Sequence, residues 1–348
     1  MTTACFIDPR TDTHTWPDHV EYAGRRQAIA RLLEESGALA RLDIRQPLPA
    51  TDEQLLTVHT PEVLDLLAQV ERERRPLFYD ADTYIVPGTN LAARLSAGAA
   101  IQAVDAVLGG RADNALVAMR PPGHHALPGQ PMGFCLLANV ALAARHARQT
   151  WGLQRVLIVD YDVHHGNGTQ DIFYSEPEVL FVSLHRWPFY PGTGSLDEIG
   201  FAAGAGATVN VPLPPGQGDA AYAAIFEQVV WPLARRFAPE LILVSVGFDA
   251  HWADPLGGQL LTLSGYDHLA RELIRMADAF CSGRIVFVLE GGYHLPALAQ
   301  GVLDLALALL GDPAGNDPLP LPEDLRRRAA RLPPPDGVIA RVRRLHGL

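Results

Sequence analysis

The sequence is poor in cysteine. Cys5, Cys135 and Cys281 are the only three in 348 residues, an odd number, widely spaced and set among apolar residues. This usage excludes a disulfide framework and indicates reduced core thiols in a reducing compartment. We therefore expect a cytoplasmic location.

The chain also lacks a basic charge balance, a targeting segment and a long apolar run. Its formal net charge is −11, so no global positive field favours nucleic acid, and we expect no nucleic-acid partner. Met1 is followed by Thr-Thr-Ala-Cys, without the basic start and apolar run of a signal peptide. We identify no apolar stretch long and uninterrupted enough to cross a membrane, and so expect no membrane partner.

What the sequence does contain is an α/β pattern. Hydrophobic residues make up 48% of the chain and charged residues 19%, which supports a well-buried globular core. Short apolar runs alternate with helical patterns, and this predicts a single domain with a mainly parallel central sheet and helices on both faces. In such sheets ligands bind beyond the carboxyl ends of the strands. The predicted strands are 4–7, 115–119, 156–159, 179–184, 209–211, 241–246 and 285–289.

Helices are predicted between these strands. Asp219 is expected to cap a helix over 220–237, and Ser264 with Asp267 to form a capping box for a helix ending at 280. The other main helices are predicted at 25–35, 91–108, 136–149 and 296–310. Residues 311–348 have clustered prolines and a basic run, and we interpret them as a surface appendage of the same domain, available for packing in a homo-oligomer.

The stretch 156–168 is the centre of the sequence. Its apolar start predicts a buried strand that runs straight into Asp160, Asp162 and His164. On an extended backbone, residues two apart point to the same face, so Asp162 and His164 converge just past the strand's end. A carboxylate and an imidazole there suit a catalytic zinc or iron(II) ion better than a structural zinc. The alternative is a pair of solvated loop charges, which would not need a buried strand beneath them.

A third metal ligand is predicted at Asp249, which follows the apolar strand 241–246. Two carboxylates and one imidazole leave coordination positions open for water and a substrate oxygen. The alternative is a helix or turn cap, which a lone aspartate after a strand often is. The polar clusters that follow the other predicted strands favour the metal interpretation.

Two adjacent histidines, His124 and His125, follow the stiff segment Arg-Pro-Pro-Gly at 120–123. An imidazole beside an activated water serves as general base and then as general acid. A single histidine is more often a satisfied core residue, but two adjacent ones on a stiff loop favour the catalytic interpretation. Asp160 and Asn167 are the expected partners, because a carboxylate raises the basicity of one ring and an amide leaves the other closer to neutral. The sequence leaves open which ring is the base.

Aromatic residues follow the same strand ends. Tyr293 comes after Gly291-Gly292, a flexible pair that can deliver a phenol hydroxyl to a developing oxyanion, and the alternative is a surface tyrosine in a turn. Phe134 and Tyr190 are predicted to form two walls of a narrow channel for an alkyl chain. Otherwise they are ordinary loop anchors.

These segments together resemble the zinc-dependent histone deacetylase and acetylpolyamine amidohydrolase family, which has an arginase-like α/β fold. The resemblance covers about residues 5–310, which would form the zinc deacetylase domain 1–310, and places the chain near the class II-like and bacterial branch. The matching segments are Arg-Pro-Pro-Gly-His-His (120–125), Gly-Phe-Cys (133–135), Asp-Tyr-Asp-Val-His-His-Gly-Asn-Gly (160–168), Ser-Leu-His (183–185), Pro-Gly-Thr-Gly (191–194), Gly-Phe-Asp-Ala (247–250), Asp-Pro-Leu-Gly-Gly (254–258) and Glu-Gly-Gly-Tyr (290–293).

The resemblance implies a hydrolase that removes acetyl or other acyl groups from acetyl-lysine-like substrates. The alternative is a deacetylase of acetylpolyamines or other small N-acyl amines. Zinc would bind Asp162, His164 and Asp249, the histidine pair would do acid–base work, and Tyr293 would polarise the acetyl carbonyl. A non-catalytic binder of acetylated ligands is disfavoured because a binder has no need of paired bases. An arginase-like ureohydrolase is disfavoured because the run after His164 lacks the additional aspartates that hold two manganese ions.

The resemblance also implies a substrate channel and a second cation. Gly133 would offer its carbonyl oxygen to the substrate amide, with Phe134 and Tyr190 on either side. Tyr190 stands where phenylalanine is more usual, and so narrows or polarises one wall. Leu256 stands where polyamine-selective relatives can carry an acidic residue, and its apolar side chain speaks against that route to polyamine selectivity. The expected loop 71–87 offers acid elsewhere, through Asp80 or Asp82. A structural potassium ion is implied, mostly on backbone oxygens, near Asp160, Asp162, His164, Ser183 and Leu184.

Overall fold

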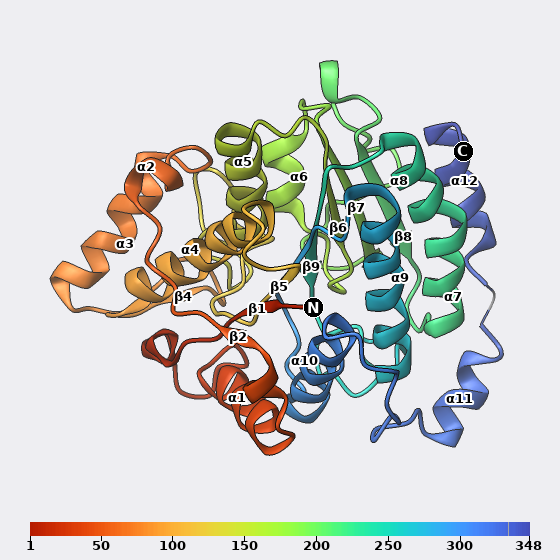
Figure 1. Ribbon diagram of the computed structural model, residues 1–348, viewed down its shortest axis with the longest axis horizontal. Helices are drawn as coiled ribbons and strands as arrows, with labels where there is room; N and C mark the ends of the chain where they lie inside the picture. The colour runs from red at the N-terminus through yellow and green to blue at the C-terminus, as the bar shows by residue number, and fades with distance from the viewer. Residues whose placement is uncertain (333) are drawn as a thin grey trace.

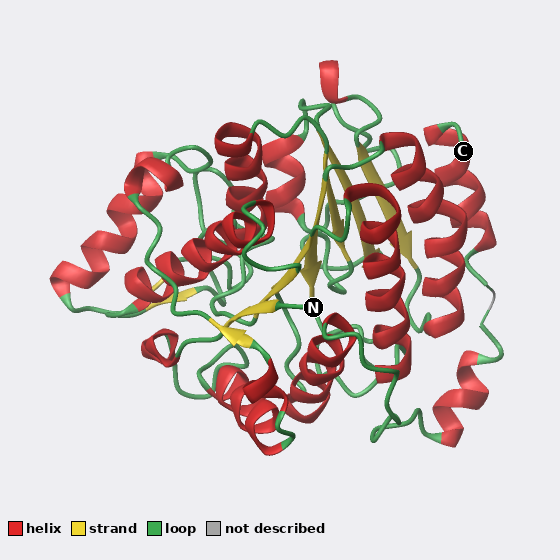
Figure 2. Ribbon diagram, viewed as in Figure 1, coloured by secondary structure: helices red, strands yellow, loops and turns green. Residues whose placement is uncertain are grey.

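An eight-stranded sheet forms the centre of the computed structural model, which describes residues 1–348 except residue 333 (Figure 1, Figure 2). The strand order is β2-β1-β5-β10-β9-β6-β7-β8, and neighbouring strands are parallel throughout, so the predicted mainly parallel sheet is confirmed. The strands are β1 (Thr3–Phe6), β2 (Asp43–Ile44), β5 (Asn114–Val117), β6 (Val156–Asp160), β7 (Val179–Arg186), β8 (Thr208–Leu213), β9 (Leu241–Val246) and β10 (Ile285–Leu289). A separate antiparallel hairpin joins β3 (Leu77–Phe78) and β4 (Tyr84–Ile85), within a segment that we expected to be a loop.

Helices cover both faces of the sheet, as the layers in Figure 1 show. Alternate residues of each strand face opposite sides, so Leu157 and Val159 of β6 pack into one apolar cluster and Val156 and Ile158 into another. The first cluster is completed by α1 (Gly24–Glu35), α7 (Asp219–Ile225), α8 (Trp231–Phe237), α9 (Leu263–Cys281), α10 (Leu295–Leu309) and α12 (Asp336–His346). The second is completed by α4 (Thr89–Leu108), α5 (Asn139–Trp151) and α6 (Asn167–Phe173).

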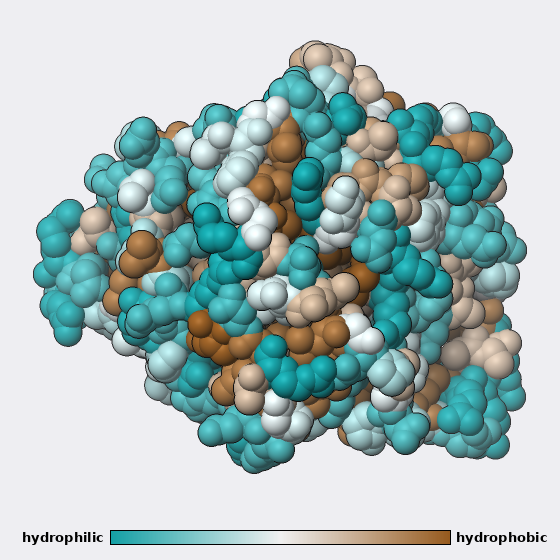
Figure 3. All heavy atoms as spheres, viewed as in Figure 1, coloured by the Kyte–Doolittle hydropathy of each residue, from teal (hydrophilic) through white to brown (hydrophobic). Residues whose placement is uncertain are grey.

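The remaining short elements lie around this core. They are the 3₁₀ helices η1 (Pro9–Thr13), η2 (Ala38–Arg41) and η3 (Ala202–Gly204), the π-helix η4 (Phe226–Val230), and α2 (Asp52–Leu55), α3 (Pro61–Glu73) and α11 (Glu323–Ala329). The exterior face drawn in Figure 3 is mostly hydrophilic, with apolar patches near its middle.

Two predicted helix caps are wrong, and one contact explains both. The carboxylate of Asp219 accepts hydrogen bonds from the backbone N–H (2.9 Å) and the hydroxyl (2.7 Å) of Thr262, so the N-cap of α7 is Gly218. Thr262 in turn caps α9, because its hydroxyl oxygen accepts from Gly265 N–H at 3.1 Å. Ser264 therefore lies inside the first turn of α9 and forms no capping box. The helix predicted over 220–237 is divided into α7, η4 and α8.

The expectation that no stretch is long and apolar enough to cross a membrane is also wrong by length and composition. Helix α4, with 20 residues, is the one such helix in the described part of the chain. Most of it is buried inside the protein. The small residue Gly98 allows close packing there, since a Cβ atom would lie 2.1 Å from the carbonyl oxygen of Leu48. These features are typical of the core helix of a globular protein.

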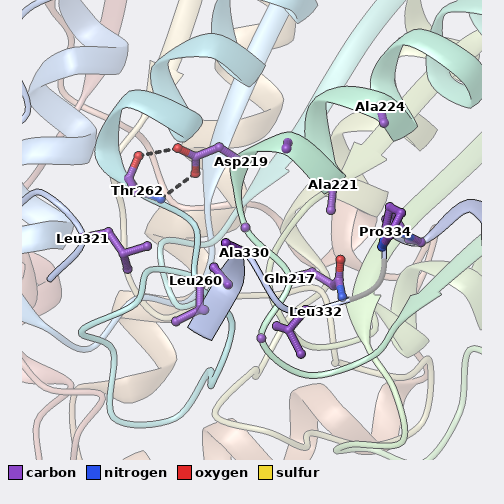
Figure 4. A pocket seen from close by; sticks show the side chains of 15 residues that line it. Gln217, Asp219, Ala221, Ala224, Leu260, Thr262, Leu321, Ala330, Leu332 and Pro334 are labelled. Carbon is purple, nitrogen blue, oxygen red and sulfur yellow. Dashed lines mark hydrogen bonds between the residues drawn. The ribbon is translucent and has the colours of Figure 1, made fainter. Parts of the chain in front are cut away.

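The C-terminal segment packs on its own chain. Ile339 and Val342 of α12 belong to the main core cluster and cover β8, the strand at one edge of the sheet. A cavity of about 390 Å³ lies between the start of α7 and the residues around α11 (Figure 4). Its lining is mostly apolar, and the carboxylate of Asp219 is bonded to Thr262. The division of the chain at residue 310 stays a prediction.

Candidate active site

Polar side chains gather at the carboxyl ends of four strands that are neighbours in the order β5-β10-β9-β6. Each strand is buried along its length and mostly apolar, and polar residues follow it. The structure thus brings together the predicted residues His124 after β5, Tyr293 after β10, Asp249 after β9 and Asp162 after β6.

Asp162, His164 and Asp249 form one compact group, with ligand atoms all within 4.8 Å of one another. Nδ1 of His164 lies 3.1 Å from Oδ1 of Asp162 and 3.1 Å from Oδ2 of Asp249. Burial and the neighbouring Asp162 raise the pKa of Asp249 to about 7. Burial also disfavours the charged form of Asp162, but His124 and His164 hold its pKa below the usual value. Two carboxylates this close repel each other, and a cation bound between them would relieve that repulsion.

The backbone around this group is shaped to orient the carboxylates. Gly291 N–H donates to Oδ2 of Asp162 at 2.9 Å, and Val163 N–H donates to Oδ1 of Asp249 at 2.9 Å. A Cβ atom on Gly247 would lie 2.0 Å from Oδ2 of Asp162, so glycine is needed there. Two oxygens and one nitrogen, without a thiolate, fit a catalytic zinc or iron(II) ion.

The two predicted histidine partners are in place. Nδ1 of His124 is 2.9 Å from Oδ2 of Asp160, and Nδ1 of His125 is 2.7 Å from Oδ1 of Asn167. The ring centroids of the two histidines are 4.0 Å apart. Because Nδ1 of His125 bonds an amide oxygen, that nitrogen carries the proton and Nε2 is left as an acceptor.

The charges of the two rings differ strongly. Burial opposes a charge on His124, but the carboxylates of Asp162 and Asp160 outweigh it and raise its pKa to about 10. Burial lowers the pKa of His125 well below its ordinary value, and the neighbouring His124 and His164 add to this effect. The surroundings therefore favour a cationic His124 and a neutral His125.

Two residues without a predicted role hold the backbone at Tyr293. Arg25 donates from Nε to the carbonyl oxygen of Gly292 at 2.8 Å, and its guanidinium carbon lies 4.9 Å from the centre of the Tyr293 ring. Oδ2 of Asp254 accepts from the Tyr293 N–H at 2.6 Å. Both contacts join distant parts of the chain, and sequence spacing carries no signal for them.

A cavity of about 230 Å³ leads to these groups, and all five predicted substrate-binding residues line it. They are Gly133, Phe134, Tyr190, Leu256 and Asp82. Phe134 has φ of 68°, a strained backbone for a residue with a side chain, and its ring meets Tyr293 edge-on at 5.7 Å. The Tyr190 ring stands perpendicular to His125 at 5.2 Å.

Phe189 also lines the cavity and was not predicted to do so. Its ring stacks on His164 at 5.2 Å, and the guanidinium of Arg186 lies 4.0 Å from its centre. The only signal in the sequence was its position next to Tyr190. For the predicted potassium site, Ser183 on β7 pairs in register with Asp160 on β6, and both Ser183 and Leu184 are fully buried.

Known proteins resemble this chain over most of its length. The family model of the histone deacetylase domain matches residues 19–309 of this chain. The chain belongs to the histone deacetylase family. It is 40% identical to histone deacetylase 14, chloroplastic, of Arabidopsis thaliana over 315 residues, which cover 86% of this chain and 74% of that protein.

Two further family members are similar. Polyamine deacetylase HDAC10 of Mus musculus is 44% identical over 314 residues, covering 86% of this chain and 46% of that protein. The crystal structure of the HDA15 HD domain superposes with a TM-score of 0.90 at 36% identity, covering 99% of this chain and 96% of that one. The fold expected from the resemblance is confirmed along the chain.

Proposed function

We propose that this chain is a zinc-dependent deacetylase that hydrolyses the amide bond of acylated amines. Family membership supports a deacetylase. The observation that carries the proposal is the buried group of Asp162, His164 and Asp249 beside a histidine pair at the base of a mostly apolar cavity. A zinc ion held by these three side chains would polarise the acyl carbonyl and the attacking water.

The histidines would share the proton transfers. Neutral His125, with Nε2 free to accept, takes the proton of the attacking water and later returns it to the leaving amine. Asp162 and Asp160 favour a cationic His124, which would stabilise the negative charge that develops on the substrate. This assignment rests on the groups behind the rings, a carboxylate for His124 and an amide for His125.

Tyr293 and Gly133 would bind the two ends of the reacting amide. The Tyr293 hydroxyl donates a hydrogen bond to the oxyanion, and the Gly133 carbonyl accepts one from the amide N–H. Phe134 and Tyr190 flank the alkyl chain. These roles are supported by the position of all four residues on the same cavity.

We further propose an acetyl-lysine side chain as the preferred substrate. Leu256 places an apolar residue on the channel, which disfavours a cationic polyamine at that point. Asp82 at the same cavity favours a cation instead, and the similarity to polyamine deacetylase HDAC10 keeps acetylpolyamines as the second candidate.

A substrate panel tests this choice. The zinc-loaded chain should hydrolyse acetyl-lysine peptides with kcat/KM at least about tenfold above acetylputrescine and acetylspermidine, because one misplaced polar contact is worth about that factor. The reverse order would select the polyamine function, and no hydrolysis of any acylated amine would contradict both. The potassium ion, cytoplasmic location, homo-oligomer and absence of nucleic-acid and membrane partners stay predictions.

A further inference from the structure

Glu290 is a buried acid that the proposed function does not use. It stands at the carboxyl end of β10, which lies between β5 and β9 in the sheet, and its side chain is fully buried. Oε2 accepts from the backbone N–H groups of Gly123 (2.6 Å) and His124 (3.1 Å). Oε1 bonds the hydroxyl of Ser245 on β9 at 3.0 Å.

These hydrogen bonds connect β10 to the histidine loop and to β9, and both of these lead to candidate catalytic groups. One N–H belongs to His124 itself, and Ser245 lies on the strand that leads to Asp249. The two histidines sit on an irregular loop, whose backbone N–H groups have no strand partner to hold them in place. A fixed acceptor beneath the loop therefore sets the position of both rings relative to the metal ligands.

A second metal ion is a weaker interpretation of the same residues. His124, Cys135 and Glu290 offer ligand atoms within 4.8 Å of one another. Both oxygens of Glu290 already bond protein donors, and Nδ1 of His124 bonds Asp160. Two of the three groups that would hold such an ion therefore already bond protein partners.

We propose that Glu290 is a positioning residue, which holds the histidine loop in register with the metal ligands by accepting its backbone N–H groups. The proposal rests on the proposed function. This role requires an oxygen that accepts the two backbone N–H groups. A glutamine at position 290 supplies such an oxygen, and its amide nitrogen can donate to the hydroxyl of Ser245. A methionine has a similar length and is apolar, so it fills the space without accepting strongly.

Three variants separate these possibilities. Glu290→Met should lower kcat at least about tenfold with KM within about twofold, because small displacements of catalytic groups slow the chemical step more than substrate binding. Glu290→Gln should stay within about threefold of the unchanged chain. Glu240→Met is the matched control. Glu240 also accepts two backbone N–H groups, from Gln154 (2.8 Å) and Arg155 (2.9 Å), but at the opposite end of the sheet, and its loss should leave kcat unchanged.

Amide hydrogen exchange gives a readout that does not depend on turnover. Exchange over residues 120–126 should be faster in Glu290→Met than in Glu290→Gln and in the unchanged chain. Normal kcat or normal exchange in Glu290→Met would overturn the proposal, as would an equal loss of kcat in Glu290→Gln, which would indicate a role for charge. If the unchanged chain hydrolysed no acylated amine, the proposed function would fail, and the exchange measurement would still decide the role of Glu290.

Discussion

His124 and His125 are neighbours in sequence and in space, and they differ in the group behind each ring. Asp160 lies 2.9 Å from one and Asn167 lies 2.7 Å from the other. A carboxylate favours the cationic imidazole and an amide oxygen does not. The sequence predicted both partners but left the roles open, and the hydrogen-bonding atoms now support His125 as the base.

Replacing Tyr293 with phenylalanine tests the proposed oxyanion donor. We expect kcat to fall by about a hundredfold or more, because removal of one such donor has that effect. The ring can keep its edge-on contact with Phe134 and its place beside Arg25, so the substrate KM should change little. Steady-state kinetics of the zinc-loaded variant measure both constants. A variant that turns over as fast as the unchanged chain would remove Tyr293 from the mechanism.

Residues of the candidate site were predictable where a polar side chain follows an apolar strand. Asp162 and Asp249 both follow this rule, and the period of two along a strand placed His164 beside Asp162. Glu290 follows the same rule, yet two of its three hydrogen-bond partners are backbone N–H groups, which cannot be identified from residue types. Asp254 acts in the same way on Tyr293 N–H. Contacts to backbone atoms are therefore one part of the candidate site that the sequence did not predict.

Among the elements, a buried ion-pair network ties the N-terminal segment to the loop after β5. Glu21 is fully buried and bonds Nη2 of Arg120 at 2.6 Å and Nη1 of Arg25 at 3.1 Å. Replacing Glu21 with glutamine leaves two buried guanidinium groups without a countercharge, which should cost about 3–5 kcal/mol in the free energy of unfolding. Denaturant titration measures this change, and a loss below about 1 kcal/mol would mean that the network contributes little.

A second prediction concerns α10. Burial raises the pKa of Asp304 to about 6, and Asp267 and Asp317 add to the shift while Gln300 and Arg271 oppose it. The folded state therefore binds this proton more tightly than the unfolded state, so stability falls as pH rises from about 4 to 6. Asp304→Asn should raise Tm by about 1–3 °C near pH 8 and leave it unchanged near pH 4. Calorimetry at both pH values checks this, and an equal gain at both would show that charge is not the cause.

Strands and helices were predicted closely where a long apolar or amphipathic pattern decides them, as in β9 and α10. The predictions are wrong where a residue distant in the sequence forms the hydrogen bond that a local cap was expected to form. Asp219 was expected to cap its own helix, but its carboxylate accepts a hydrogen bond from the hydroxyl of Thr262 instead. The order of the strands and the β3–β4 hairpin were not predictable either, because local patterns do not specify which strands pair.

At the scale of the whole molecule, the charge of −11 should favour cationic substrates. For an arginine-rich acetyl-lysine peptide, we expect kcat/KM to fall severalfold between about 20 and 200 mM salt, because screening weakens the attraction. A neutral acetyl-lysine peptide of the same length is the control and should show little change. Equal salt dependence for both peptides would mean that the acidic surface does not steer the substrate.

The central claim is that Asp162, His164 and Asp249 hold one zinc ion that is required for deacetylation. Its most direct test is to strip the chain of metal with a chelator, add zinc stepwise, and follow hydrolysis of an acetyl-lysine peptide together with metal content. We predict that activity disappears and then returns in proportion to zinc up to one ion per chain, and that His164→Ala recovers none of it. Activity that survives complete metal removal, or full recovery in His164→Ala, would contradict the claim.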